Sequence, residues 1–325
     1  MKFLFYTDPK LPWEKKIDEL RNEFPDTEFI LQEKSTEKDL EEAHALIGMI
    51  PLDHIRLAKQ LKMIFVSFTG PNMFPLDELK KKGIRLSNTH GNARYVAERG
   101  IAMAMALCGK IVEYHEDLKN ARWHGIWGKG GLEDTWDSIQ GKGCAVIGTG
   151  EIGRWIARFL KTFDCHVTGF KKRPVSGRVE HFDKIAFDLD EALKNSEIVF
   201  ITLPLTRETE GMFDSRILTG MRDRLLINVG RGGVIDEEAL YHALRDGILK
   251  GAGIDVWYTY PERGTGAGYP SRFPFHELSN VILSPHVGGF VLPATMLNLE
   301  QTIENIRSYL KTGRPRYEID LDVMY

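Results

Sequence analysis

The chain has 325 residues and a formal net charge of −3. At about 100 to 200 residues per domain, this length predicts two domains. Apolar residues make up 42% and charged residues 27%, which excludes disordered and fibrous classes. The near balance of 43 basic and 46 acidic residues gives no electrostatic footprint for nucleic acid.

The apolar runs and the cysteines indicate in which cellular compartment the protein is expected. The longest strongly apolar run, Ile101 to Cys108, is too short to cross a bilayer, so we expect no membrane partner. The N-terminal MKFLFYTDPK predicts a first strand and not a secretory signal. Cys108, Cys144 and Cys165 are an odd number without metal-like spacing. We therefore expect a reducing cytoplasm, no disulfide framework and no metal site.

The first ninety residues alternate short apolar runs with amphipathic stretches. Strands are predicted at Lys2 to Tyr6, Glu28 to Leu31, Ala45 to Ile50, Met63 to Ser67 and Ile84 to Ser87. Helical patterns between them include Trp13 to Glu23 and Pro75 to Lys82. This alternation predicts parallel β-α units, because parallel neighbours need a long crossover. One long helix, predicted over Ala93 to Leu118, follows.

A second β-α series begins after residues 120–140, a stretch with three Trp and several Gly that we interpret as a loop or arm. Its first strand and helix are predicted at Cys144 to Ile147 and Ile152 to Thr162. Further strands are predicted at His166 to Phe170, Ile198 to Leu203, Leu225 to Val229, Gly253 to Trp257 and Val281 to Ser284. Residues 261–275 predict a surface loop, and a helix over Ala294 to Lys311 closes the chain.

A glycine-rich turn follows the first strand of the second series. Gly148, Gly150 and Gly153 form a G-x-G-x-x-G between an apolar strand and an amphipathic helix, the context of a dinucleotide-binding loop. The glycines allow a tight turn and close backbone approach, and the helix N-terminus favours phosphate. We therefore predict that this loop, with Glu151 and Ile152, binds a dinucleotide; the alternative is a tight turn that binds nothing.

Three cations end the next strand of this series. An NAD site usually carries an Asp or Glu about twenty residues after the glycines, but this chain has Lys171, Lys172 and Arg173. Cations at this position pair with a 2′-phosphate, which predicts a preference for NADP, with NAD possible. The alternative is a solvated basic turn.

Six stretches, taken together, resemble one family. They are Phe68 to Asn72, Gly91 to Glu98, Leu203 to Thr206 with Thr209, Asn228 to Asp236, Gly253 to Val256, and Ser284 to Gly289. In order and spacing they resemble the D-isomer-specific 2-hydroxyacid dehydrogenases, the glyoxylate and hydroxypyruvate reductases among them, over nearly the full chain.

The resemblance implies an α/β fold of two doubly wound parallel-sheet domains. A flavodoxin-like substrate domain would comprise residues 1–98 and 291–325, with a Rossmann dinucleotide-binding domain, residues 99–290, inserted in it. Relatives are usually dimers built through the coenzyme domains, so we expect a homodimer in which residues 120–140 form the arm. The alternative for this stretch is an ordinary loop within one chain.

Two residues fit the chemistry of 2-oxo acid reduction. Arg231 follows a predicted strand and is flanked by glycines, and a guanidinium can hold a carboxylate by two parallel hydrogen bonds. His286 also ends a strand, and its ordinary pKa of about 6.5 suits proton donation near neutral pH. Both lie where open α/β sheets bind ligands, at the carboxyl ends of strands.

The resemblance implies further site residues. The substrate would contact Thr69, Gly70, Asn92 and Arg231. Besides the glycine loop and the three cations, the cofactor would contact Val96, Pro204, Thr209, Val229, Gly230, Arg231, Asp255, His286 and Gly288, with Asp255 at the carboxamide.

Tyr260 departs from the family pattern, because relatives place there a glutamate that pairs with the catalytic histidine. We assign Tyr260 to the catalytic set at this position; simple packing in a loop is the alternative. A neutral tyrosine only offers a hydrogen bond, so His286 should titrate near 6.5 unless Glu262 or Glu277 is its partner.

The sequence therefore predicts a cytoplasmic oxidoreductase that transfers hydride from NAD(P)H, preferably NADPH, to a small 2-oxo acid and forms a D-2-hydroxy acid. Glyoxylate and hydroxypyruvate are the expected substrates. Phosphoglycerate is disfavoured, because Gly48 to Pro51 stands where relatives specific for it carry an arginine. Two alternatives stay open. Asp255 to Trp257 with Tyr260 also suits a formate-dehydrogenase-like enzyme, and the missing glutamate also suits a cofactor-sensing interaction protein with little turnover.

Overall fold

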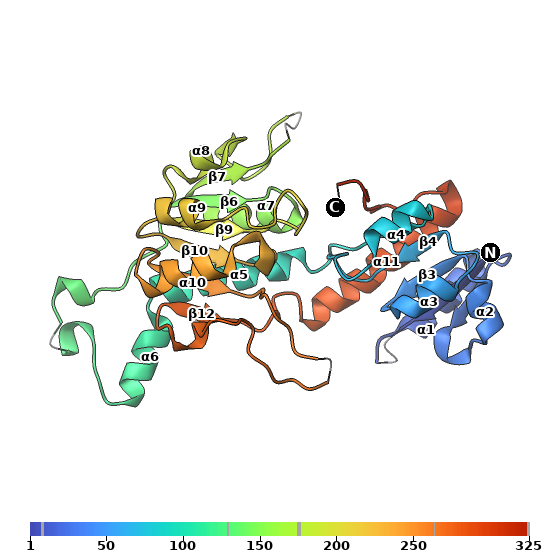
Figure 1. Ribbon diagram of the computed structural model, residues 1–325, viewed down its shortest axis with the longest axis horizontal. Coiled ribbons are helices and arrows are strands. Elements are labelled where there is room, and N and C mark those ends of the chain that lie inside the picture. Colours follow the sequence, from blue (N-terminus) through green and yellow to red (C-terminus); the bar gives the residue numbers. More distant parts are fainter. Residues whose placement is uncertain (8–9, 129, 174–176, 263, 324–325) are drawn as a thin grey trace. The chain divides into compact units, whose positions relative to one another are not determined.

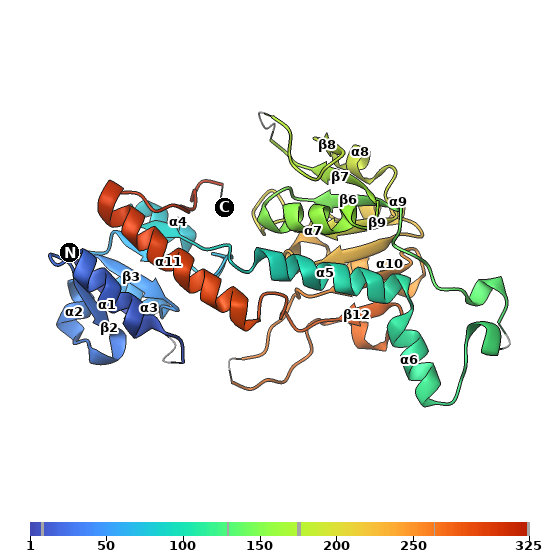
Figure 2. The same ribbon diagram turned by 180° about the vertical axis from the view of Figure 1, so that it is seen from behind.

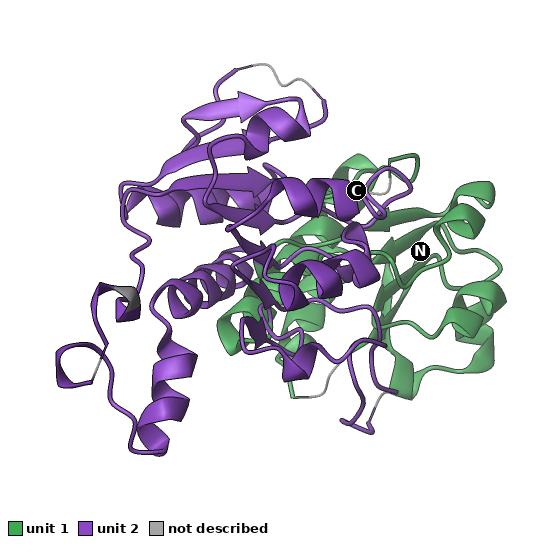
Figure 3. Ribbon diagram, turned by 60° about the vertical axis from the view of Figure 1, so that its left-hand side comes forward, with its two compact units in different colours: residues 1–92, 290–325 green, residues 93–289 purple. Residues whose placement is uncertain are grey.

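The computed structural model describes residues 1–7, 10–128, 130–173, 177–262 and 264–323. The chain divides into two compact units, residues 1–92 with 290–325, and residues 93–289 (Figure 1 and Figure 3). Each unit is built around one parallel sheet with helices on both faces, which confirms the predicted α/β class. No described helix is both long and apolar enough to span a membrane.

The sheet of the first unit has five parallel strands in the order β2-β1-β3-β4-β5. The strands are β1 (Lys2–Tyr6), β2 (Glu28–Leu31), β3 (Ala45–Gly48), β4 (Met63–Phe65) and β5 (Arg85–Ser87). This order is that of the flavodoxin-like folds. The resemblance therefore predicted the topology of this unit correctly.

Helices cover both faces of this sheet. On one face lie α1 (Trp13–Glu23) and α11 (Leu292–Thr312) (Figure 2). Their side chains share a core with Phe3 and Phe5. The other face is covered by α2 (Glu37–Glu41), α3 (Leu52–Leu57) and α4 (Leu76–Lys81). The closing helix of the chain thus completes the core of the first unit.

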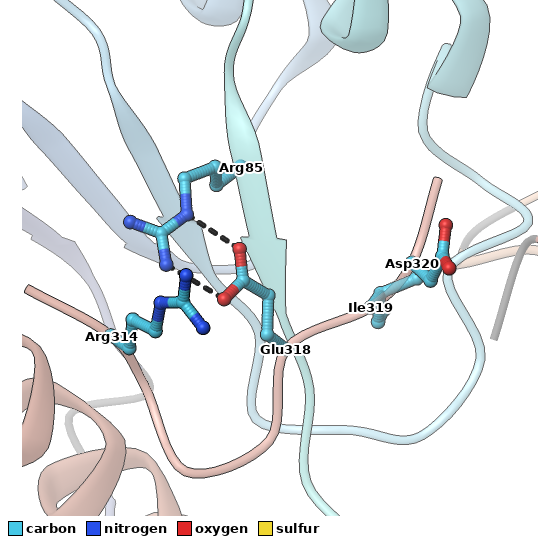
Figure 4. A pocket seen from close by; sticks show the side chains of 5 residues that line it. All are labelled: Arg85, Arg314, Glu318, Ile319 and Asp320. Carbon is cyan, nitrogen blue, oxygen red and sulfur yellow. Dashed lines mark hydrogen bonds and ion pairs between the residues drawn. The ribbon is translucent and has the colours of Figure 1, made fainter. Parts of the chain in front are cut away.

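The C-terminal tail is bound to β5 through Arg85. Its guanidinium pairs with the Glu318 carboxylate, at 2.7 Å for Nη2 and Oε2, and donates from Nη1 to the Gly313 carbonyl at 2.7 Å. These side chains border a cavity of about 420 Å³ that Arg314, Ile319 and Asp320 also line (Figure 4). The cavity holds two basic and two acidic side chains, so its charges balance.

The sheet of the second unit has seven parallel strands in the order β12-β11-β10-β9-β6-β7-β8. They are β6 (Gly143–Ile147), β7 (His166–Phe170), β8 (Lys184–Ala186), β9 (Ile198–Ile201), β10 (Leu225–Asn228), β11 (Gly251–Ile254) and β12 (Val281–Leu283). Strand β6 lies between β7 and β9, so the strand order reverses beside it. Doubly wound sheets bind their ligands at the carboxyl ends of the strands at such a reversal.

Both faces of this sheet are buried, which explains why its central strands are continuous apolar runs. Helices α5 (Ala93–Cys108) and α7 (Glu151–Lys161) cover one face (Figure 2). Helices α8 (Leu189–Leu193), α9 (Ser215–Gly220) and α10 (Glu237–Arg245) cover the other.

The prediction of one helix over residues 93–118 is wrong. Helix α5 ends at Cys108, and α6 (Ile111–Lys119) begins after Gly109 and Lys110. Lys110 has a left-handed φ of 48°, a conformation that ends an α-helix. Helix α5 belongs wholly to the second unit, so the expected boundary between residues 98 and 99 falls inside it.

Candidate active site

The strand order of the second unit brings the candidate residues to one sheet edge. His286, Asp255, Arg231, Pro204 and Gly148 each follow one of five adjacent strands, from β12 at the edge to β6. Because all these strands are parallel, their carboxyl ends meet at the same edge. The site is therefore assembled from loops that are far apart in sequence.

The glycine loop joins β6 to α7 and fits a dinucleotide. Gly148 has a φ of 110°, which only glycine adopts readily. A Cβ on Gly153 would lie 2.0 Å from the Gly148 carbonyl oxygen, so this glycine is required for the helix to approach the strand. A Cβ on Gly150, the N-cap of α7, would meet nothing within 4 Å. The helix N-terminus, with Glu151 and Ile152 in its first turn, thus faces open space in which a pyrophosphate could bind.

Two threonines, one unpredicted, order the loops beside this space. The Thr202 hydroxyl, just after β9, donates to the Gly148 carbonyl at 2.9 Å. Thr209 donates from Oγ1 to the Pro204 carbonyl at 2.7 Å and accepts from the Thr206 N–H at 2.8 Å. Thr202 was missed because the predicted strand ran on to Leu203, whereas β9 ends at Ile201 and leaves Thr202 in the loop.

The three predicted cations follow β7, next to β6. The side chain of Lys172 is 60% exposed, and its Nζ lies 3.2 Å from the Glu208 carboxylate. Lys171 is half-buried and Arg173 is exposed. The positive charge is thus at the strand end that neighbours the glycine loop.

The Arg231 loop packs tightly between the segments that follow β9 and β11. A Cβ on Gly230 would lie 2.7 Å from the Leu203 carbonyl oxygen, and one on Gly232 would lie 2.4 Å from that of Trp257. The Arg231 guanidinium donates from Nη1 to the Gly230 carbonyl at 2.7 Å. Burial lowers its pKa, although a guanidinium stays charged at any physiological pH. The loop therefore holds a cation in a partly desolvated position.

Asn228, at the end of β10, holds the backbone of this loop with its side chain. Its Oδ1 accepts the Gly230 N–H and its Nδ2 donates to the Arg231 carbonyl, both at 3.1 Å. The side chain is 1% exposed, so these hydrogen bonds do not compete with water. Val229, between them, is buried as well.

Asp255 binds the backbone of the histidine turn. Its carboxylate accepts the N–H groups of Val287 at 3.0 Å and Gly288 at 2.9 Å, and it also accepts the Ser284 hydroxyl. Gly288 is required here, because a Cβ would lie 2.7 Å from Asp255 Oδ2 and 3.5 Å from the Cα of Val96 on α5. With a 2% exposed carboxylate, Asp255 is thus a structural anchor of this turn.

His286 sits in a left-handed turn, with a φ of 57°. This conformation costs a residue with a Cβ about 1 to 2 kcal/mol, so the surrounding hydrogen bonds must hold it. Burial lowers the pKa of the ring and the Arg231 charge lowers it further, while Asp255 raises it. The expectation of an ordinary pKa near 6.5 is therefore wrong, because it left out burial and the neighbouring guanidinium.

Tyr260 lies beside the histidine ring, with ring centroids 5.4 Å apart and planes tilted by 49°. Its hydroxyl accepts the Trp257 N–H at 3.1 Å. Among the residues the structure describes, no carboxylate is within salt-bridge distance of His286; Glu277 is instead 3.9 Å from His276. Neither Glu277 nor Glu262 therefore replaces the glutamate of the family.

The predicted substrate residues Thr69, Gly70 and Asn92 belong to the first unit. The Thr69 hydroxyl lies 2.7 Å from Asn92 Oδ1 and 2.9 Å from the Thr89 carbonyl, and Asn88 Nδ2 donates to the Thr69 carbonyl at 2.8 Å. The structure thus joins Thr69 and Asn92, with Gly70 next in the chain. Within the described part of the chain, no cluster of His, Cys, Asp and Glu could hold a metal ion.

Known proteins resemble this chain in sequence and in structure. The family model described as "D-isomer specific 2-hydroxyacid dehydrogenase, NAD binding domain" matches residues 101–288. A glyoxylate/hydroxypyruvate reductase B of Pectobacterium carotovorum is 32% identical over 74% of this chain and 73% of its own. A mitochondrial formate dehydrogenase of Solanum tuberosum is 27% identical over 85% of this chain and 72% of its own. An acyclic imino acid reductase, in complex with NADPH and D-Arg, superposes with a TM-score of 0.78 at 26% identity, over 98% of this chain and 100% of that one.

The chain therefore belongs to the D-isomer specific 2-hydroxyacid dehydrogenases. It is an NAD(P)-dependent oxidoreductase of the class that transfers hydride between the nicotinamide cofactor and a small 2-oxo or 2-hydroxy acid.

Proposed function

We propose that this enzyme prefers NADPH and reduces small 2-oxo acids, such as glyoxylate and hydroxypyruvate, to D-2-hydroxy acids. The observation that carries the proposal is the gathering of Arg231, His286 and the glycine loop at one edge of a parallel sheet. The name of the Pectobacterium relative supports the substrate class.

Two side chains perform the chemistry in this proposal. Arg231 forms the two-pronged hydrogen bond to the substrate carboxylate and polarises the adjacent ketone. His286, in its imidazolium form, donates a ring proton to the ketone oxygen and becomes neutral. Bound NADPH supplies the hydride. We also propose Thr69, Gly70 and Asn92 as substrate-binding residues, and Tyr260 packs against the histidine ring.

The cofactor-binding residues fall into three groups. The pyrophosphate is held by the backbone of the glycine loop and the start of α7. The adenosine side is flanked by Pro204, Thr209 and the three cations. The nicotinamide side is lined by Val96, Val229, Gly230, Asp255 and Gly288. Asp255 has one oxygen, Oδ2, that accepts a single described hydrogen bond, so it can still accept one from a carboxamide.

The preference for NADPH can be tested by removing the positive charges that follow β7. Each charge-assisted hydrogen bond to the 2′-phosphate contributes about 1.5 to 3 kcal/mol, enough for a preference of about tenfold or more. We expect kcat/KM to be higher with NADPH than with NADH, and the double variant Lys171→Ser/Arg173→Ser to abolish this difference. A wild type that uses NADH equally well would contradict the proposal.

The decisive experiment is a substrate panel. We expect oxidation of NADPH with glyoxylate and with hydroxypyruvate. Where the product is chiral, as glycerate is, we expect the D enantiomer. Formation of reduced cofactor from formate would instead favour the formate alternative, to which the Solanum relative lends partial support. Tight cofactor binding without turnover of any substrate would favour the sensor alternative.

A second candidate reaction is reduction of imines formed from 2-oxo acids and amines. Hydride adds to the carbon of a protonated imine while the C=N π pair becomes the nitrogen lone pair, so no proton donor is required. A histidine without a carboxylate partner suits this reaction, and the similar imino acid reductase supports it. With pyruvate and methylamine, mass spectrometry should detect N-methylalanine; lactate alone would exclude this candidate.

The assembly proposed here is a homodimer in the cytoplasm. The arm, residues 120–140, exposes five large apolar side chains, Trp123, Ile126, Trp127, Leu132 and Trp136, and Ile126 is 92% exposed. Such a surface is typical of a protein interface. The three cysteines are free and buried, which supports a reducing compartment.

A further inference from the structure

A chain of hydrogen bonds leads from helix α5 to the turn after β12. Arg99, on α5, donates from Nε and Nη2 to Ser284 Oγ at 3.1 and 3.0 Å. The Ser284 hydroxyl in turn meets Asp255 Oδ1. Asp255 then accepts the N–H groups of Val287 and Gly288. Every link lies in the second unit, and Ser284 is only 1% exposed.

The geometry fixes the direction of the Ser284 hydroxyl. A serine oxygen has one proton to donate and two lone pairs to accept with. Arg99 supplies two N–H donors to that oxygen, which occupies both lone pairs. The proton can then point only toward Asp255, so Arg99 determines which way the hydroxyl donates.

The turn that this chain holds is the one that carries His286. The residue is left-handed, and the N–H groups of the next two residues both end on Asp255. A second hydrogen bond, from Trp257 Nε1 to the Ser284 carbonyl at 2.8 Å, fixes the start of the turn. The turn is therefore held at its start by Trp257 and at its end by Asp255. The second of these contacts requires that the Asp255 carboxylate keeps its orientation.

We propose that Arg99 and Ser284 are positioning residues for the catalytic histidine, acting through Asp255. The inference rests on the proposed function, since it takes His286 as the proton donor. Every hydrogen bond that the described residues show for the Arg99 side chain ends on Ser284. A misplacement of about 1 Å at a reacting group can cost about a hundredfold in rate, so small shifts of this turn should be measurable.

The test uses the full-length enzyme with NADPH and glyoxylate. We expect Arg99→Met and Ser284→Ala each to lower kcat about tenfold or more while KM for glyoxylate, whose carboxylate Arg231 binds, changes less than about twofold. Ser284→Thr retains the hydroxyl and should restore kcat to near the wild-type value. A looser turn exposes the ring to water and favours the imidazolium, so the pH above which reduction declines should rise in Arg99→Met.

Three controls separate the possible outcomes. The double variant Arg99→Met/Ser284→Ala should be no slower than Ser284→Ala alone, because both act on one path. Arg158→Met removes an arginine of α7 that stacks on Trp155 and should leave kcat unchanged. A fully active Arg99→Met, or additive losses in the double variant, would overturn this inference. Full activity of His286→Asn would overturn the proposed function instead.

Discussion

At the scale of single residues, Arg231 is the group on which recognition of the substrate carboxylate depends. Two charge-assisted hydrogen bonds together contribute about 3 to 6 kcal/mol, so we expect Arg231→Ala to lower kcat/KM at least a hundredfold. Arg231→Lys should fail almost as badly, because an ammonium cannot reproduce the planar fork. Cofactor titration by tryptophan fluorescence should show normal binding in both. A lysine variant with near-normal kcat/KM would refute two-pronged binding.

The charge state of His286 sets the pH dependence. Its pKa is lowered below the ordinary 6.5 by burial and by Arg231, and ketone reduction needs the imidazolium. Reduction should therefore decline as pH rises through this lowered pKa, below 6.5. Tyr260→Glu would place a carboxylate beside the ring, raise the pKa of His286 and move this decline upward by about one pH unit or more. The measurement is kcat/KM against pH from 5 to 9.

Tyr260→Phe is the control for this experiment. It keeps the ring packed against His286 and removes the hydroxyl that accepts the Trp257 N–H. Its pH profile should stay like that of the wild type. If Tyr260→Glu has the same profile as Tyr260→Phe, the side chain at this position does not govern the protonation of the histidine.

At the scale of elements, two glycines of the β6–α7 turn have different roles: Gly153 is needed for folding, and Gly150 is needed only for cofactor binding. A methyl group on Gly153 would lie 2.0 Å from the Gly148 oxygen, so Gly153→Ala should lower Tm and weaken NADPH binding together. A methyl group on Gly150 meets nothing within 4 Å, so Gly150→Ala should keep the wild-type Tm. Its methyl group would still enter the space for the pyrophosphate and weaken binding about tenfold or more. Unchanged NADPH affinity in Gly150→Ala would mean that the dinucleotide lies elsewhere.

The elements that the sequence predicted well are the ones with strong local patterns. Strands β6 and β10 are mostly apolar runs and β7 alternates exposed with buried residues at its start, and each was found within a residue or two. The helices α2, α3, α8 and α9 and the strand β8 were not predicted, and each has only three to six residues, which carry little periodicity. The nine-residue helix α10 was also missed, although its buried residues Leu240, Ala243 and Leu244 follow a helical spacing. The break after Cys108 was not predicted either. Gly109 stands at the break, but a glycine does not by itself end a helix, and Gly100 lies inside α5.

The same division applies to the site. Arg231 and His286 were identified because each follows a strand within a glycine-flanked motif. The Asp255 contacts with the histidine turn depend on backbone donors 32 and 33 residues away, which no local pattern encodes. Arg99 reaches Ser284 across 185 residues, so its role required the structure.

At the scale of the whole molecule, the arm should determine the assembly. Its exposed side chains pack on no described core residue. We expect the wild type to be a dimer and Ile126→Glu/Trp127→Glu to be a folded monomer, as measured by light scattering after gel filtration. Leu57→Glu, at a 45% exposed leucine of α3, is the control and should remain dimeric. A wild type that is monomeric at micromolar concentration would refute the dimer.

A histidine within the arm should make this association depend on pH. The ring of His124 lies between Asp117 Oδ2 at 2.9 Å and Asp134 Oδ1 at 2.7 Å, and it stacks on Tyr114 with centroids 4.3 Å apart. Hydrogen bonds that the protonated ring donates to Asp134 and Asp117 raise its pKa above 6.5. The protonated ring therefore holds the arm fully below about pH 6.5, and this stabilisation is lost as pH rises through the raised pKa.

Above that pKa the neutral ring leaves two carboxylates close together, so the arm should loosen and the dimer should dissociate more readily. We expect the dissociation constant, measured by analytical ultracentrifugation, to rise between pH 6.5 and 9. In His124→Gln the constant should be higher at pH 6 and nearly independent of pH, because glutamine carries no charge to lose. A wild-type constant that stays flat across this range would show that the His124 cluster does not support the dimer surface.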